Sequence, residues 1–176
     1  MNTQRPEPGD YAPFYNSYVA LVPELDIVST LEAQVPIVRR VAEAVPAERE
    51  SFAYAAGKWT VRQVFGHMCD AERVFGFRAF TFSRSVAQPQ PGFDENVYVE
   101  QARYHDIALA ELAEEFAAIR SLNLRVLKSL RGDRWNVRGV ANNNPITIRG
   151  LAYVMAGHVR HHLAILHDRY ALEKPA

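Results

Sequence analysis

Residues 148–171 read IRGLAYVMAGHVRHHLAILHDRYA and carry the clearest helical pattern in the chain. The apolar side chains of this stretch recur at the spacing of one face of an α-helix, and Thr147 stands just before it as an N-cap. Residues four apart lie on the same face of a helix, so His158 and His162 share the apolar face. The stretch therefore predicts a long buried helix from which two histidines point inward.

Three earlier segments show the same helical period. They span residues 26–46, 60–82 and 109–132. The second begins with a capping box, because Thr60 and Gln63 have the spacing that this motif requires. In the first, Pro36 lacks a backbone donor and crowds the preceding turn, so we expect a kink or a local break there. With no long alternation of apolar and polar residues and no fixed repeat, the sequence predicts an all-α, four-helix bundle.

The remaining segments flank or connect these helices. We expect residues 1–25 to form an N-terminal arm packed on the bundle, and residues 26–176 to form a single bundle domain. Asp94 stands where it can cap a short helical turn around residues 97–101, inside a long loop. Residues 133–145 are predicted to form a polar connector with no sheet.

The bulk composition excludes several classes of protein. The chain has 176 residues, 48% of them hydrophobic, which suffices for one buried core. Lys and Arg together number 20, as do Asp and Glu, so no net charge attracts nucleic acid. No apolar run approaches the roughly 20 residues that cross a bilayer, and the first residues carry no export signal. With a single cysteine, Cys69, and hence no internal disulfide, we expect a cytoplasmic protein without nucleic-acid or membrane partners.

The histidines on apolar faces predict a metal site. Two imidazoles one turn apart on one helix can converge on the same ion, and His67 on the apolar face of the second helix offers a third donor. Any one of the three could instead be a core histidine satisfied by a hydrogen bond. Three imidazoles together would leave several buried nitrogens to satisfy, which a cation does at once. We therefore predict that His67, His158 and His162 bind one divalent metal ion.

Other candidate residues fit a site less well. His161 lies near the edge of the apolar stripe and His167 on the opposite side, while His105 lies in a loop-like stretch. Cys69 is interpreted as a small core residue rather than a nucleophile. Asp70 is a candidate partner for a metal-binding histidine rather than a metal ligand itself. The phenylalanines near the end of the second helix, at positions 75, 77, 80 and 82, fill a core, an interface or a pocket wall, and we assign them no role.

Several motifs together resemble the DinB-like family. They are KWTV at residues 58–61, GHMCDAER at 66–73, PGFDE at 91–95, the stretch 139–147, and AGHVRHHLAIL at 156–166. The resemblance covers nearly the whole chain. It implies an up-down-down-up four-helix bundle, a homodimer, and a zinc or nickel ion held by His67, His158 and His162.

Known members of that family differ in function. They include thiol S-transferases that use bacillithiol, an isomerase that uses mycothiol, and proteins induced by DNA damage whose activity is uncertain. The sequence shows no second domain of the kind that the isomerase carries. A shared fold does not fix one function, so the family alone leaves the activity open.

Two functions remain open from the sequence. The first is a metal-dependent enzyme that acts on a small molecule, by thiol S-transfer with a bacillithiol-type thiol or by hydrolysis. Hydrolysis would need a general base, and Asp70 and Glu72 are the acidic residues nearest in sequence to a ligand. The alternative is a non-catalytic, stress-related protein that binds a small molecule and keeps the metal for stability.

Overall fold

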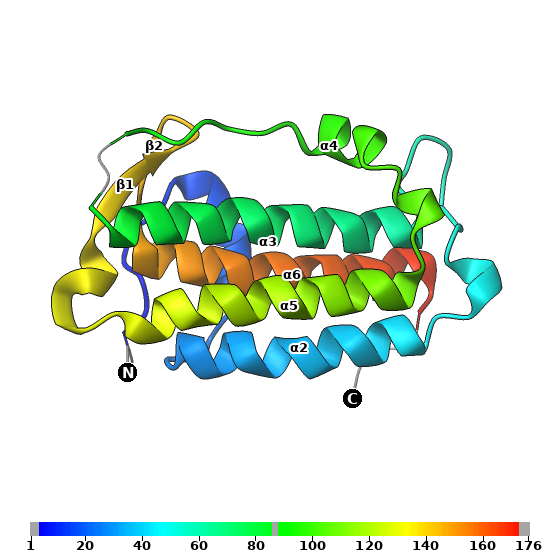
Figure 1. Ribbon diagram of the computed structural model, residues 1–176, viewed down its shortest axis with the longest axis horizontal. Helices are drawn as coiled ribbons and strands as arrows, with labels where there is room; N and C mark the ends of the chain where they lie inside the picture. The colour runs from blue at the N-terminus through cyan, green and yellow to red at the C-terminus, as the bar shows by residue number, and fades with distance from the viewer. Residues whose placement is uncertain (1–3, 86–87, 173–176) are drawn as a thin grey trace.

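All four periodic segments form helices in the computed structural model, which describes residues 4–85 and 88–172. They are α2 (Ile27–Glu43), α3 (Val61–Ser83), α5 (Leu109–Ser129) and α6 (Ile148–Tyr170). In Figure 1, α2 and α6 run one way along the bundle, and α3 and α5 run the other way. The predicted all-α bundle with up-down-down-up order is therefore confirmed.

Side-chain caps set where two of these helices begin. The Thr60 hydroxyl accepts a hydrogen bond from the Gln63 amide, and the Gln63 side chain accepts one from the Thr60 amide. The Thr147 hydroxyl accepts from the Gly150 amide at 3.0 Å. Both caps satisfy amides that an isolated helix end leaves unpaired. The predicted starts of α3 and α6 are confirmed.

Helix α2 continues without interruption through Pro36, so the local break expected there does not occur. Pro36 is exposed, and so is Glu32, whose carbonyl loses its helical partner. Water can hydrogen-bond a carbonyl at the surface, which reduces the cost of the missing donor.

Helices α3 and α5 run in the same direction, so the segment between them must return along the whole bundle (Figure 1). It contains α4 (Glu95–Gln101) and a 3₁₀ turn, Tyr104–Asp106. The Asp94 carboxylate caps α4 as predicted. The Tyr104 ring packs against Gly66 of α3, where a Cβ atom would lie 2.3 Å from it. This contact ties the end of the crossover segment to α3.

The connector before α6 contains a hairpin that the sequence analysis missed. A 3₁₀ turn, Gly132–Asn136, leads into antiparallel strands β1 (Arg138–Ala141) and β2 (Asn144–Thr147). Asn142 and Asn143 both have positive φ, which a two-residue hairpin turn of type I′ requires and asparagine tolerates. Strands of four residues are too short to show a clear alternation, so the polar composition concealed them.

The N-terminal segment lies on α6. Helix α1 (Asn16–Ala20) packs there, preceded by a 3₁₀ turn, Pro13–Tyr15. A further 3₁₀ turn, Ala47–Arg49, follows α2. The approach is close at Gly157, where a Cβ atom would lie 2.1 Å from the Tyr18 carbonyl oxygen. Residues 1–3 of the predicted arm and 173–176 of the predicted domain lie outside the described residues.

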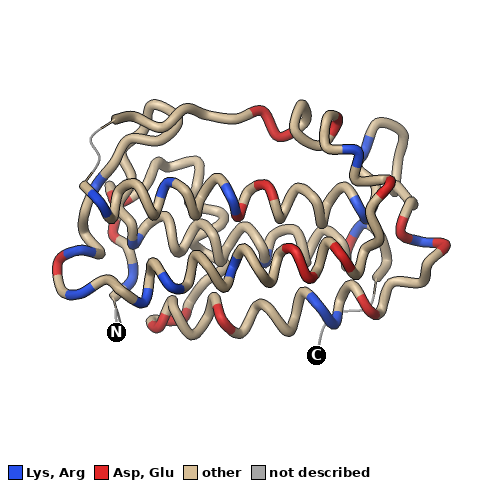
Figure 2. Tube along the Cα trace, in the orientation of Figure 1, with Lys and Arg blue, Asp and Glu red and all other residues tan. Residues whose placement is uncertain are grey.

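The charged residues of the bundle are mixed in sign. Figure 2 shows acidic residues in the first half of α5 and basic residues in its second half. Acidic residues toward the N-terminus of a helix and basic residues toward its C-terminus interact favourably with the helix dipole. Among the described residues, no helix is both long and apolar enough to cross a membrane.

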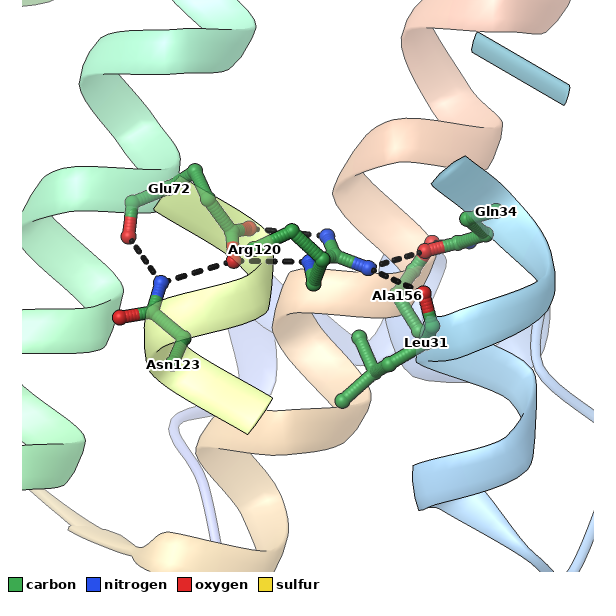
Figure 3. A network of polar contacts seen from close by, with 6 residues as sticks. All are labelled: Leu31, Gln34, Glu72, Arg120, Asn123 and Ala156. Atoms are coloured by element: carbon green, nitrogen blue, oxygen red, sulfur yellow. Dashed lines mark hydrogen bonds and ion pairs between the residues drawn. The ribbon is translucent and has the colours of Figure 1, made fainter. Parts of the chain in front are cut away.

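A buried polar network joins all four long helices (Figure 3). We call it the Arg120 network, and it comprises Leu31, Gln34, Glu72, Arg120, Asn123 and Ala156. The Arg120 guanidinium donates two bonds to the Glu72 carboxylate, at 2.7 and 2.8 Å, and both side chains are at most 2% exposed. It also donates to the Gln34 side chain and the Leu31 carbonyl, and Gln34 donates to the Ala156 carbonyl at 2.7 Å. The network therefore fixes how the four helices sit beside one another.

Candidate metal centre

Three histidine side chains meet inside the bundle. His67 of α3 and His158 and His162 of α6 are 5% to 7% exposed. The Nε2 atom of His158 lies 3.0 Å from that of His67 and 3.1 Å from that of His162. We call these residues the histidine cluster. The structure thus brings together all three predicted ligands, in an arrangement that could hold a metal ion.

The helices present these imidazoles because each lies on a buried face. His158 and His162 are one turn apart on α6, and His67 lies opposite them on α3 about two turns beyond the Thr60 cap. Helices α3 and α6 pack directly against one another. The three imidazoles therefore converge once the helix caps and the core packing set the register of α3 against α6.

Aromatic rings surround the cluster. The Trp59 ring lies 4.7 Å from the His67 ring, centroid to centroid. The rings of Tyr18 and Phe75 each meet the His158 ring edge-on at 5.6 Å. These rings restrict the motion of the imidazoles and keep water from most of their surface.

Burial keeps the cluster neutral. It lowers the pKa of His67 to about 4, and the nearby imidazole of His161 acts in the same direction. Burial also lowers the pKa values of His158 and His162 well below the usual value, with further contributions from neighbouring histidines. At neutral pH each imidazole is uncharged and keeps one nitrogen lone pair, which is the form that binds metals.

The donor set fits a divalent transition-metal ion. Ligand nitrogens at about 2.0–2.1 Å from a tetrahedral zinc ion would lie roughly 3.3 Å apart, close to the Nε2 separations here. Three clustered nitrogens of one kind cannot satisfy each other fully, because a neutral imidazole has one donor and one acceptor. A cation resolves this conflict.

A cleft of about 230 Å³ leads to the cluster, and we call it the His162 cleft. Its walls include Trp59, Asn96 and Tyr170. The Tyr170 hydroxyl donates to the Trp59 carbonyl at 2.6 Å, and the Tyr54 ring lies 5.0 Å from that of Tyr170. One ligand of the cluster is thus reachable by a small molecule through an aromatic opening.

The acidic candidates have other partners. Glu72, one of the two acidic residues nearest in sequence to a ligand, is bound to Arg120, so its contacts do not favour a role as general base. The Asp70 carboxylate lies 3.9 Å from Arg73, and burial raises its pKa, while the nearby Tyr104 and Arg73 side chains oppose that shift. Neither carboxylate lines the His162 cleft.

Cys69 is a core residue. It is 0% exposed, and its Sγ donates to the Leu112 carbonyl at 3.3 Å. Burial raises the pKa of its thiol, which keeps it protonated and unreactive at neutral pH. Its position agrees with the interpretation from the sequence.

The other histidines lie outside the cluster. His105 is exposed beside Asp106, and His167 lies beside Asp168 at 2.7 Å. His161 is half-buried, with its ring 5.2 Å from that of Tyr18. The sequence analysis set all three aside as ligands, and none belongs to the group of described residues that could hold a metal.

The sequence analysis missed the aromatic surroundings. Trp59 precedes α3 and has no helical periodicity to place it, and Tyr18 reaches the cluster only because the arm folds back onto α6. Phe75 had a usable signal, because it lies eight residues after His67 on the same apolar face. We now place it against His158.

Comparisons with known proteins agree with this architecture. The sequence matches the DinB superfamily over residues 30–166. A search of curated protein sequences gave no match. Among solved structures, the chain is similar to YfiT from Bacillus subtilis, described as a probable metal-dependent hydrolase with an unusual four-helix bundle topology. The TM-score is 0.72 at 18% identity, over 84% of this chain and 87% of YfiT, which shows a shared fold. The match to the family profile covers well over half of the sequence and confirms the resemblance seen in its motifs: the chain belongs to the DinB superfamily.

Proposed function

We propose that this protein is a metal-dependent enzyme that transfers a low-molecular-weight thiol to a small electrophile at the histidine cluster. The observation that carries the proposal is the convergence of three neutral imidazole nitrogens at the end of an open cleft. The metal we expect is zinc or nickel, as the family resemblance implies. His67, His158 and His162 act as ligands.

A divalent ion held there would supply a Lewis acid that lowers the pKa of a bound thiol or water. The chain's own residues then set what reaches it. Trp59 and Tyr170 provide apolar walls that exclude bulk water and orient a flat or apolar acceptor. Lys58 lines the same cleft and offers a cation to a thiol that carries carboxylates.

The lining of the cleft favours thiol transfer over hydrolysis. A bound thiol needs to lose only its own proton, whereas attack by water is helped by a positioned general base. Among the described residues, no acidic side chain lines the His162 cleft, and Glu72 is bound to Arg120. Hydrolysis is the second candidate, because YfiT, which has the same fold, is described as a probable metal-dependent hydrolase.

The test is a comparison of metal-loaded and metal-free protein. We expect the loaded protein to join a bacillithiol-type thiol to a model electrophile, and His162→Ala to lose this activity. His105→Ala is the matched control, because it removes an exposed imidazole outside the cluster. Equal rates with and without metal would exclude the proposal.

The same preparations separate the alternatives. Metal-dependent cleavage of esters or amides without thiol transfer would support hydrolysis. Tight metal binding with neither activity would support the non-catalytic role, in which the metal joins α3 to α6.

A further inference from the structure

A second cavity lies between α3 and the crossover segment, and no residue lining it also lines the His162 cleft. Its volume is about 360 Å³. Val74 and Phe77 of α3 form one wall, and Pro91, Phe93 and Tyr98 of the crossover form the other. The rings of Phe93 and Tyr98 lie 5.2 Å apart. We call this cavity the Arg78 pocket, after the more deeply buried of the two arginines that line it.

Arg78 is a buried cation. It is 3% exposed, and its Nη2 donates to the Pro91 carbonyl at 2.6 Å. The Tyr15 side chain also interacts electrostatically with Arg78. Among the described residues, no carboxylate forms an ion pair with Arg78, whereas the equally buried Arg120 is paired in a bidentate fashion with Glu72. A buried charge without a counter-charge is costly, so its presence calls for an explanation.

The other charged groups near the pocket do not neutralise Arg78. Arg73 is the other charged residue in its lining, and it is paired with Glu115 at 2.7 Å and lies 3.9 Å from Asp70. None of the described residues that line the pocket is acidic. The pocket therefore has apolar, aromatic walls and an uncompensated positive charge.

We propose that the Arg78 pocket binds a small aromatic carboxylate. Its carboxylate would accept hydrogen bonds from the Arg78 guanidinium, and its ring would lie against Phe77, Phe93 and Tyr98. A single unpaired guanidinium among apolar walls suits a monoanion better than a phosphate dianion, which needs more donors. The site is separate from the histidine cluster, although Phe75 contacts both, lying 6.0 Å from Arg78 Cζ and 5.6 Å from the His158 ring.

The test is calorimetric titration of the full-length, metal-loaded protein with 2-naphthoate and with its neutral counterpart 2-naphthamide. We expect saturable binding of the naphthoate at one site, and binding of the amide at least tenfold weaker. Arg78→Met should weaken naphthoate binding at least tenfold. Arg84→Met is the matched control, because Arg84 is exposed on the same helix end, and it should bind as the parent does.

Two further variants keep the result decisive. Val74→Trp fills the pocket from a half-buried position and retains Arg78, so it should also abolish binding. It decides the matter if Arg78→Met does not fold. His162→Ala tests whether the naphthoate binds the metal instead. Unchanged binding in Arg78→Met or Val74→Trp, equal binding of the amide, or loss of binding in His162→Ala would each overturn the proposal.

Discussion

The bundle buries two polar clusters that are built in opposite ways. In the Arg120 network each donor meets an acceptor, and the two charges cancel, with Arg120 and Glu72 joined by two short hydrogen bonds. In the histidine cluster the same nitrogen of three neutral rings points to one place. The first cluster is complete within the chain, and we propose that a metal ion from outside completes the second.

This difference suggests a structural role for the Arg120 network and a binding role for the histidine cluster. A fully paired network specifies how helices pack, since any other arrangement leaves a charge unpaired. Three imidazole nitrogens of one type that face one another cannot satisfy one another fully, which disfavours folding. Such an arrangement is kept where a binding site needs it. The two clusters are also coupled, because the positive charge of Arg120 helps to lower the pKa of His158.

Breaking the complete cluster should have the largest effect. Arg120→Met leaves the Glu72 carboxylate buried without a counter-charge, and we expect it to lower the free energy of unfolding by about 3–5 kcal/mol. Urea denaturation of the metal-free protein measures this. The double variant Arg120→Met with Glu72→Gln removes both charges and should recover much of the loss. A single variant as stable as the parent would contradict the structural role of the network.

Lowering the pH should have a smaller effect on stability, through the histidine cluster. In the unfolded chain His67 binds a proton near pH 6.5, but in the folded chain its pKa is about 4. The unfolded state thus binds more protons between these values, so stability falls as the pH falls through this window. For His67 alone we expect a loss of about 2 kcal/mol between pH 7 and pH 5.

The measurement is urea denaturation of metal-free protein at both pH values. His67→Ala should have a weaker pH dependence than the parent, and His105→Ala should match the parent. The same slope in all three proteins would show that the cluster is not buried in its neutral form.

Removal of a helix cap should have the smallest effect and should leave both clusters intact. Thr60→Ala removes the hydroxyl that caps α3, and we expect it to cost about 1 kcal/mol. Thermal unfolding measures the cost, and metal content provides the second readout. If packing rather than the cap holds His67 in place, the metal content stays that of the parent; a variant that loses its metal would assign that role to the cap.

Much of this architecture follows from local patterns. The helical period places α2, α3, α5 and α6, and the caps at Thr60 and Thr147 fix two starts because they depend on neighbouring residues alone. The histidine cluster was predictable for a related reason. Two of its members share one helix at a spacing of four, and His67 lies on the apolar face of another.

The features that the sequence did not predict depend on contacts between distant segments. The hairpin before α6 is held by pairing and by two asparagines in a tight turn, and its strands are too short to show a pattern. Glu72 resembled a candidate base until its partner Arg120, 48 residues away, was placed beside it. Arg120 did leave a signal, because it lies on the apolar stripe between Phe116 and Leu124.

We propose that His67, His158 and His162 together bind one metal ion. Elemental analysis would be performed on untagged protein, purified without chelators or nickel resin. Single alanine variants at these three positions and at His105 would be analysed beside it. We predict about one zinc or nickel ion per chain in the parent and in His105→Ala, and loss of the metal in each of the other three variants. A parent free of metal, or cluster variants that keep it, would contradict the claim.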